Sequence, residues 1–552
     1  MGRAGRIEDI GHLRPIRRIA RMGHVGRIGR KRHMPPVRQM CRVSRLPLTL
    51  GALLVTSASA FATPTADMRE ALQRAGVPES ALGFVVLDAA SGRTLLEWQG
   101  DLPLNPASLA KLVTTQAALE RLGPAWTWST PVWVQGTIRE GSAREGGVLE
   151  GDLHIKGGGD PKLVHERLWL LLRRVMQLGV REIRGDIVLD NSAFALPDIA
   201  PGEFDGEAMR PYNVRPAALL LNYRAVVYTF TPDAGTGVAR VGVEPALARS
   251  EVERTVPLVS GPCNDWRTVL DARFDHPNGG PGHASGSGVA AAATHSATGA
   301  AQPAGGTRVR FGGRYPLACG EQVWPLADAH PASYDQRLLE GLWREMGGTL
   351  HGRVREGPAP SGLKPTFEHR SPALAEVVRD INKFSNNVMA EQLALTLVRE
   401  AAPQVPATPE AARALLQRWL AERLGAAAAA GAVLGNGSGL SRDSRLTARQ
   451  LARVLLLAHR SPTMPELAAS LPVTAVDGTA RRLRGAAGRA HLKTGSLRDS
   501  YGLAGYVLAA DGRRLVLAAM IQHPYANAAR PALDALVQWA ATASLATRPA
   551  QP

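Results

Sequence analysis

The stretch from Asn105 to Lys111 (NPASLAK) restricts the fold and chemistry of this chain more than any other. It has the pattern of a loop that ends in a helix, with Ser108 suited to cap a helix over 109–122. Because positions i and i+3 share a helix face, the Ser108 hydroxyl and the Lys111 amine come within hydrogen-bonding reach. A hydroxyl becomes a good nucleophile when a neighbouring base takes its proton. The pair therefore predicts a site in which Lys111 is that base, provided that burial or nearby positive charge lowers its pKa.

Lysine is scarce in this chain, which makes each lysine informative. The sequence has 65 Lys and Arg residues, of which only 7 are lysines. They are Lys31, Lys111, Lys156, Lys162, Lys364, Lys383 and Lys493. A GC-rich coding bias explains the excess of arginine, and arginine cannot give up its proton at accessible pH. A lysine kept against that bias is a candidate for chemistry that arginine cannot perform.

The positive charge of the chain is concentrated near its N-terminus. The net charge is +17, but residues 1–45 hold 13 basic and 2 acidic residues, so the remainder carries only +6. A body so close to neutral gives little support for nucleic-acid binding, and we expect no nucleic-acid partner. Met34 and Met40 are alternative start positions within this basic region.

The same region has the pattern of a secretory signal. Arg42 and Arg45 precede the apolar run 46–55, and small residues follow in 58–62. A basic region, an apolar run and a small-residue cleavage site are typical of exported proteins, and this run is too short to span a bilayer. We expect export to the periplasm and no stable transmembrane segment after cleavage. The alternative is a basic arm that binds nucleic acid or a membrane.

Two cysteines, Cys263 and Cys319, remain after the predicted cleavage. They can pair in an oxidising compartment, and two free buried thiols are the alternative. Cys41 lies before the apolar run and is wrongly placed for a lipid-anchored cysteine. The sequence has no His-Glu-x-x-His or paired-cysteine motif, so neither a metal site nor a cofactor is expected.

The segment from about 125 to 360 has a different residue pattern from the segments on either side, with short β-like runs between glycine-rich turns. Helices are predicted at 65–78, 161–178, 371–378, 387–399, 409–424, 447–458 and 531–545, and hairpins at 84–98 and 502–521. The stretch 157–161 lacks the Gly-Lys-Ser/Thr of a phosphate-binding loop, so a tight turn is expected there. Residues 277–306 are rich in Gly, Ala, Ser and His and are predicted to be a flexible insertion.

Two further motifs complete a set with the first. Ser385 and Asn387 form Ser-x-Asn between two predicted helices, and Lys493 opens Lys-Thr-Gly-Ser ahead of the second hairpin. Each motif is weak alone. The ordered set Ser-x-x-Lys, Ser-x-Asn and Lys-Thr-Gly marks the active-site serine enzymes that react with penicillin.

More stretches agree with this set, namely Pro106-Ala107-Ser108, the GNGSGLSR stretch from Gly435 to Arg442, and Asp477-Gly478-Thr479. With them, residues 65–545 resemble the class C low-molecular-mass penicillin-binding proteins, the D-alanyl-D-alanine carboxypeptidase/endopeptidases of peptidase family S13. The long separation of the first two motifs is specific to that family. Asn436 stands where the family is expected to have Asp, and we interpret its loop as structural.

The resemblance implies an α/β (α+β) fold. A β-lactamase/transpeptidase-like domain with an antiparallel sheet flanked by helices carries inserted β-rich domains. The expected division is an N-terminal extension with a signal peptide (1–62), a first part of the peptidase domain (63–125), inserted β-rich domains (126–360) and a second part of the peptidase domain (361–552).

Roles for the catalytic residues follow from their chemistry. Ser108 attacks the carbonyl of a D-Ala-D-Ala peptide bond, and Lys111 takes its proton. Ser385 relays a proton to the leaving amine, and Asn387 holds the substrate amide. Lys493 keeps positive potential near Lys111 and the substrate carboxylate.

The residues after Lys493 are expected to bind substrate. The hydroxyls of Thr494 and Ser496 bind the carboxylate, and Gly495 allows the substrate to approach the strand. The resemblance implies that the backbone N–H groups of Ser108 and Ser496 form the oxyanion hole. Lys383 either lines the cleft or is a helix-end cation.

An exported serine D,D-peptidase is the function that these residues favour, with peptidoglycan peptides as substrates and β-lactam antibiotics as covalent inhibitors. A serine β-lactamase of the same fold is one alternative, but no Glu-x-x-x-Asn element that would supply its deacylating base is evident. A non-catalytic cell-wall-binding homologue is the other, and the intact motifs disfavour it. The sequence leaves open the balance of carboxypeptidase and endopeptidase activity and the oligomeric state.

Overall fold

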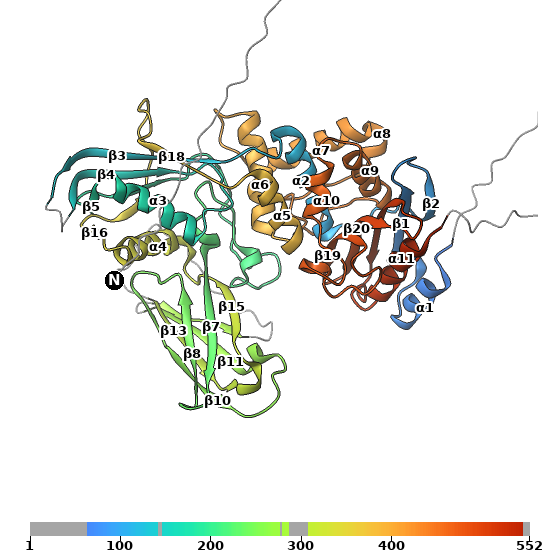
Figure 1. Ribbon diagram of the computed structural model, residues 1–552, viewed down its shortest axis with the longest axis horizontal. Coiled ribbons are helices and arrows are strands. Elements are labelled where there is room, and N and C mark those ends of the chain that lie inside the picture. The colour runs from blue at the N-terminus through green and yellow to red at the C-terminus, as the bar shows by residue number, and fades with distance from the viewer. Residues whose placement is uncertain (1–62, 142–145, 277–278, 286–306, 545–552) are drawn as a thin grey trace, which may run out of the picture. The chain divides into compact units, whose positions relative to one another are not determined.

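The computed structural model describes residues 63–141, 146–276, 279–285 and 307–544 (Figure 1). The predicted signal segment and most of the predicted insertion lie outside these residues. None of the helices in the described ranges is long and apolar enough to cross a membrane.

One antiparallel sheet joins strands from the two ends of the described chain. Its order is β19-β20-β21-β1-β2. The strands are β1 (Leu82–Asp88), β2 (Thr94–Trp98), β19 (Ala490–Leu497), β20 (Ser500–Leu508) and β21 (Arg514–Gln522). Strands β1, β20 and β21 are almost continuously buried because apolar side chains pack on both faces of the sheet. The predicted hairpins at 84–98 and 502–521 are confirmed as β1–β2 and β20–β21.

Alternation along β1 sends its side chains into two different cores. Phe84 and Val86 join a core shared with helices α1 (Ala66–Arg74) and α11 (Arg530–Thr542). Val85 belongs to a second core on the opposite face, because successive side chains of a strand point to opposite faces. The sheet is therefore flanked by helices on both sides, as the family resemblance implies.

The second core is built mainly by helices, and it carries the serine–lysine motif. These helices are α2 (Lys111–Leu122), α5 (Leu374–Phe384), α6 (Asn387–Ala401), α7 (Pro409–Leu424), α8 (Ala426–Ala429), α9 (Ala448–His459) and α10 (Met464–Ser470). A capping box at Thr447 and Gln450 starts α9. Nine of the twelve residues of α2 are buried, so the helix that follows the nucleophile is held on all sides.

Residues between α2 and α5 form further sheets. A seven-stranded sheet contains β3 (Ser129–Arg139), β4 (Gly147–Lys156), β5 (Val180–Ile183), β6 (Ile187–Asp190), β16 (Thr349–Leu350), β17 (Val354–Glu356) and β18 (Phe367–Arg370). Its path is β16-β5-β4-β3-β18, and β6 pairs with β4 and β17. Helices α3 (His165–Gln177) and α4 (Pro331–Glu345) share its apolar core.

Two smaller sheets complete this part of the chain. The order β14-β10-β8-β7-β15 joins β7 (Ala225–Asp233), β8 (Val238–Glu244), β10 (Thr255–Val259), β14 (Tyr315–Pro316) and β15 (Gln322–Ala327). The order β12-β11-β13-β9 joins β9 (Ser250–Val252), β11 (Leu270–His276), β12 (Gly279–Ser285) and β13 (Thr307–Gly313). Aromatic side chains of the two sheets pack against one another in a shared core: the ring of Phe230 on β7 contacts that of Phe311 on β13, and its centroid lies 5.5 Å from that of Tyr315.

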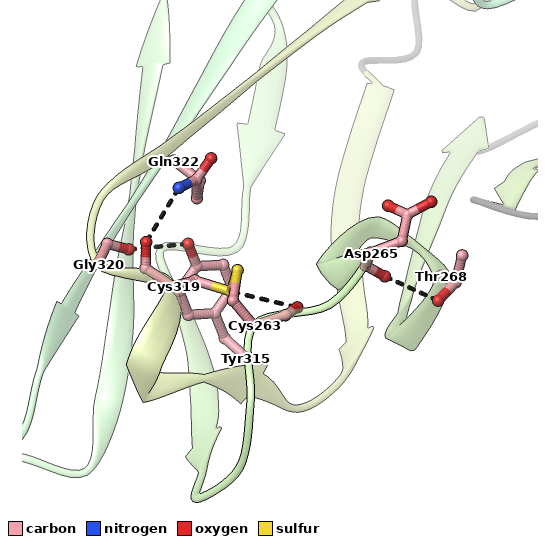
Figure 2. The surroundings of a disulfide bond; sticks show 7 residues. All are labelled: Cys263, Asp265, Thr268, Tyr315, Cys319, Gly320 and Gln322. Carbon is pink, nitrogen blue, oxygen red and sulfur yellow. Dashed lines mark hydrogen bonds between the residues drawn. A yellow bond between two sulfur atoms is a disulfide. The ribbon is translucent and has the colours of Figure 1, made fainter.

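A disulfide ties this region together. Cys263 and Cys319 are bonded, which confirms the paired alternative, with their Cα atoms 4.6 Å apart (Figure 2). The Tyr315 hydroxyl donates to the Gly320 carbonyl at 2.9 Å, and the Gln322 amide donates to the Cys319 carbonyl at 2.9 Å (Figure 2). The bond thus closes a loop of 56 residues onto a well-bonded turn.

Several predicted bounds are wrong by a few residues. The helix predicted at 161–178 begins at His165, because Asp160 instead accepts the Lys162 backbone N–H at 2.7 Å in the expected tight turn. The helix predicted at 371–378 begins at Leu374 and continues to Phe384. The flexible insertion predicted at 277–306 is wrong for 279–285, which form β12 and pair with β11.

Candidate active site

The nucleophile motif lies in a tight turn that precedes a helix. Residues Ala107–Ala110 form a 3₁₀ turn, and α2 starts only at Lys111. The prediction that Ser108 caps the helix is therefore wrong, and its hydroxyl lies 3.0 Å from the Lys111 Nζ. Asn105 holds the turn instead, since its Oδ1 accepts the Ala107 N–H at 2.9 Å and its amide donates to the Ser441 carbonyl at 2.9 Å.

Close backbone approach fixes this turn in place. Ala107 has a φ of 45°, a left-handed conformation that costs a non-glycine residue about 1 kcal/mol or more. A Cβ at Gly439 would lie 1.9 Å from the Ala107 carbonyl oxygen, and one at Gly495 would lie 2.7 Å from that of Pro106. Gly495 was expected to admit substrate. In the structure it also admits the turn that carries Ser108.

Lys111 is fully buried and has three close oxygen neighbours. Its Nζ lies 3.0 Å from the Ser108 Oγ, 2.7 Å from the Asn387 Oδ1 and 2.5 Å from the Ser438 carbonyl oxygen. Burial lowers the pKa of Lys111 to about 7, against a smaller rise caused by the Glu391 carboxylate. An amine with this pKa is available as a base near neutral pH.

Ser385 and Lys493 form a second serine–lysine pair. Ser385 ends α5 with a φ of 58°, a left-handed position at the helix terminus. The Lys493 Nζ on β19 donates to the Ser385 Oγ at 2.8 Å and to the Thr494 carbonyl at 2.6 Å. Asn387, at the start of α6, reaches Lys111, so both residues of Ser-x-Asn contact a lysine of another motif.

Lys493 is also fully buried. Burial lowers its pKa well below the ordinary value, and the positive charge of Lys111 adds to that effect. A substrate carboxylate close to Lys493 would act in the opposite direction and favour its charged form.

The predicted carboxylate-binding hydroxyls hydrogen-bond to neighbouring side chains. The Thr494 hydroxyl donates to the Thr479 hydroxyl at 2.7 Å, and the Ser496 hydroxyl donates to the Asn527 Oδ1 at 2.8 Å. Asn527 in turn donates to the Leu497 carbonyl at 2.7 Å. Sequence reasoning missed Asn527, which lies in the loop between β21 and α11 and follows no recognised motif.

Lys383 forms an ion pair with Asp477. Its Nζ lies 2.5 Å from the Asp477 Oδ2, and the other carboxylate oxygen accepts the Val473 N–H at 2.7 Å. Lys383 therefore joins the end of α5 to the turn that carries Thr479, the partner of Thr494. Neither expectation for Lys383 included this partner.

Sequence reasoning also missed Glu391, a charged residue that is hydrogen-bonded to the turn beside Lys111. It is half-buried on α6, four residues after Asn387, so the two side chains share a helix face. Its Oε1 accepts hydrogen bonds from the Asn436 amide at 2.6 Å and the Ser438 hydroxyl at 3.0 Å. An acidic residue among apolar neighbours, one turn after Asn387, was the available signal. The loop that we interpreted as structural thus contacts both Glu391 and, through the Ser438 carbonyl, Lys111.

The five predicted catalytic side chains meet in one place through these contacts. Within the ranges that the structure describes, no group of three or more His, Cys, Asp or Glu side chains could hold a metal ion. The site contains a serine hydrogen-bonded to a buried lysine of lowered pKa, and a second serine–lysine pair lies beside it. These are the groups that a serine acyl-transfer enzyme requires. With a mixed helix-and-sheet domain around it, this is the class of the penicillin-reactive serine enzymes.

Comparison with known proteins makes the assignment more specific. Residues 65–256 and 285–543 match the D-Ala-D-Ala carboxypeptidase 3 (S13) family. The chain belongs to this family and is therefore a serine-type D-Ala-D-Ala carboxypeptidase by class. A D-alanyl-D-alanine carboxypeptidase of Actinomadura sp. (strain R39) is 29% identical over 483 residues, which cover 85% of this chain and 83% of the relative.

Solved structures agree on the fold. Penicillin binding protein 4 (dacB) from Haemophilus influenzae superposes with a TM-score of 0.63 at 20% identity, over 86% of this chain and all of that one. A structure of the same protein complexed with a novel β-lactam has a TM-score of 0.58 at 20% identity, over 83% of this chain and 96% of that one. The expected penicillin-binding fold is confirmed.

Proposed function

We propose that the enzyme hydrolyses the D-alanyl-D-alanine bond of peptidoglycan stem peptides through an acyl-enzyme on Ser108. The contacts of Lys111 are the observation that carries this proposal. A neutral amine has two N–H donors and one lone pair. The carbonyl oxygens of Asn387 and Ser438 take the two donors, so the lone pair is directed to the Ser108 hydroxyl, 3.0 Å away.

Acylation begins when Lys111 accepts the Ser108 proton and the Ser108 oxygen bonds to the penultimate D-alanine carbonyl carbon. The backbone N–H groups of Ser108 and Ser496 stabilise the oxyanion, and one such donor is typically worth about 3–4 kcal/mol. The carbon–nitrogen bond then breaks as Ser385 passes its proton to the leaving amine and takes up the proton that Lys111 carries, which returns Lys111 to its neutral form. D-Alanine departs, and the acyl group remains as an ester on Ser108.

Lys493 supports this step in two ways. Its ammonium group attracts the terminal carboxylate of the substrate, together with the hydroxyls of Thr494 and Ser496. Its bond to the Ser385 hydroxyl at 2.8 Å orients that hydroxyl for proton transfer. Asn387 holds the substrate amide while it remains bonded to Lys111.

Deacylation repeats the chemistry with water. Lys111 takes a proton from water, the hydroxide attacks the ester carbonyl, and Ser108 leaves with the proton returned to it. The products are the shortened peptide and a free enzyme. Cross-links between stem peptides present the same acyl D-alanine group, so we include endopeptidase activity in the proposal.

A β-lactam offers the same carbonyl in a strained ring. Ser108 opens the ring, but the leaving amine stays attached to the acyl group. We therefore propose that β-lactams acylate Ser108 covalently. The complex of the Haemophilus influenzae relative with a β-lactam supports this proposal.

We further propose that the enzyme is exported to the periplasm, where its substrate lies. The signal pattern at 42–62 supports export. In this proposal the peptidase domain comprises 63–125 and 361–552, and 126–360 are inserted domains.

One experiment tests the reaction. The enzyme is incubated with benzylpenicillin and weighed intact, and D-alanine release from a stem pentapeptide is measured in parallel. We expect a long-lived adduct of one benzylpenicillin, release of D-alanine, and loss of both in Ser108→Ala. Rapid penicillin turnover without D-alanine release would establish a β-lactamase instead, and no adduct would refute the acyl-enzyme.

A further inference from the structure

A carboxylate lies directly behind the base of this site. Glu391 is on α6, one helical turn after Asn387, and Asn387 accepts a hydrogen bond from Lys111. The acyl-transfer mechanism assigns nothing to Glu391. Yet its carboxylate is joined to the serine–lysine pair by a short chain of hydrogen bonds.

The connection runs through the turn from Asn436 to Ser438. The Glu391 Oε1 accepts the Asn436 amide at 2.6 Å and the Ser438 hydroxyl at 3.0 Å. The Asn436 Oδ1 accepts the Ser438 backbone N–H at 3.1 Å, which closes the turn. The Ser438 carbonyl accepts a hydrogen bond from the Lys111 Nζ at 2.5 Å.

An amide at position 436 suits this arrangement. Asn436 donates to Glu391 with one end of its side chain and accepts from Ser438 with the other. An aspartate there would have to share a proton with Glu391, because two adjacent carboxylates cannot both ionise readily. With Asn436, Glu391 has no second carboxylate beside it to compete for the negative charge.

We propose that Glu391 is a positioning residue of the serine–lysine pair. It holds the Ser438 carbonyl on one N–H of Lys111 and places a negative charge behind the amine. The lone pair of Lys111 is thereby kept on Ser108, and the basicity of the amine is kept high enough for proton abstraction. This inference rests on the proposed role of Lys111 as the base.

The charges around the two groups support this coupling. Burial raises the pKa of Glu391 to about 7, and the hydrogen bond from Ser438 and the positive charges of Arg215 and Lys111 act against it. Burial lowers the pKa of Lys111 to about 7, and Glu391 is the charge that raises it. The positive charge of Lys111 in turn helps to lower the pKa of Lys493 on β19. The charged forms of Glu391 and Lys111 therefore stabilise each other.

Glu391 also faces a cavity that is separate from the serine–lysine pair. Together with Arg215 and Asn436 it lines a cavity of about 580 Å³, whose lining includes neither Ser108 nor Lys111. Removing the charge of Glu391 therefore need not disturb the substrate side of the site. This makes a charge-neutral substitution a usable test.

The test is the pH profile of Ser108 acylation by benzylpenicillin, from pH 5 to 9, for the full mature chain and for Glu391→Gln. Without the carboxylate, the pKa of Lys111 falls, so the rise of the rate with pH should move down by about one pH unit. A weaker base should also lower the plateau rate about threefold or more. A loss of structure alone would lower the rate at every pH and leave the midpoint where it is.

Two variants control for charge and location. Glu391→Asp keeps the charge and should leave the midpoint within about 0.3 pH units, although its shorter side chain lowers the rate. Glu400→Gln removes an α6 carboxylate that pairs with Arg399 at 2.5 Å, and it should change neither midpoint nor plateau.

An unchanged midpoint in Glu391→Gln, or an equal movement in Glu391→Asp, would overturn the proposal. If Glu391→Gln does not fold, Ser438→Ala breaks the same connection and should move the midpoint in the same direction, and a wild-type midpoint there would overturn it. Failure of the proposed function looks different, because the wild-type enzyme would then form no adduct on Ser108.

Discussion

Substituting arginine for each of the two buried lysines separates a base from a fixed charge. Lys111→Arg fixes a permanent positive charge beside Ser108, and Lys493→Arg fixes one beside Ser385. Both side chains are fully buried, so both substitutions face similar packing costs. What differs is whether the proposed task requires loss of a proton.

The magnitude for Lys111 follows from its environment. With a pKa of about 7, roughly nine-tenths of Lys111 is neutral at pH 8. An arginine with a pKa above about 12 is neutral in fewer than about one molecule in ten thousand. It therefore offers almost no lone pair to the Ser108 hydroxyl. We expect Lys111→Arg to slow acylation by about three orders of magnitude or more, on the order of 4 kcal/mol.

Lys493→Arg should cost much less. The guanidinium supplies the positive charge that the substrate carboxylate needs, but its planar head does not fit where Lys493 reaches the Ser385 hydroxyl at 2.8 Å and the Thr494 carbonyl at 2.6 Å. Misplacement in a packed site costs roughly 1–3 kcal/mol. The loss should be divided between acylation and binding of the peptide substrate.

The assay is the second-order rate of acylation by benzylpenicillin, followed by intact mass, at pH 8. Circular dichroism and melting temperature establish that each variant is folded, and D-alanine release gives kcat and KM for the peptide. If Lys111→Arg acylates as fast as Lys493→Arg, Lys111 is only an electrostatic residue. The base would then have to be another group.

Further expectations concern pH, the disulfide, the insertion and export. Acylation should rise with pH and be half-maximal near pH 7, because Lys111 is neutral above its pKa of about 7; a flat profile from pH 6 to 9 would contradict this. Replacing Cys263 and Cys319 with alanine should lower the free energy of unfolding by about 4 kcal/mol in denaturant titrations, since a loop of 56 residues is opened; an unchanged midpoint would argue otherwise. Replacing 286–306 with a short Gly/Ser linker should leave melting temperature and acylation nearly unchanged, and a large loss of either would show that the segment packs on the body. Sequencing of periplasmic protein should find an N-terminus within 61–63, and material that still starts at residue 1 would exclude cleavage.

Local sequence was sufficient for the chemistry that depends on near neighbours. Ser108 and Lys111 are three residues apart, so any helical turn brings them close, and that contact holds although the turn is 3₁₀ rather than α. Short apolar runs and the turn residues between them were likewise enough for the hairpins β1–β2 and β20–β21. A family resemblance then joined three motifs that spacing alone could not join.

Tertiary structure decided everything that depends on partners distant in sequence. Asn105, and not Ser108, holds the start of the motif, because its bonds reach Ser441 across the fold. Lys383 pairs with Asp477, and no local pattern connects positions 94 residues apart. The burial that lowers the pKa of Lys111 is likewise a property of the packed core.

For Glu391, one property follows from the sequence and another only from the tertiary structure. Its position one turn after Asn387 is evident from the sequence, since helical periodicity places the two on one face. Its connection to Lys111 is not, because it passes through a turn that joins the site from between α8 and α9. Sequence thus determined which groups are present and which near neighbours meet. Packing determined which of them are buried, charged and coupled, because desolvation and hydrogen bonding depend on contacts that the chain makes only once it is folded.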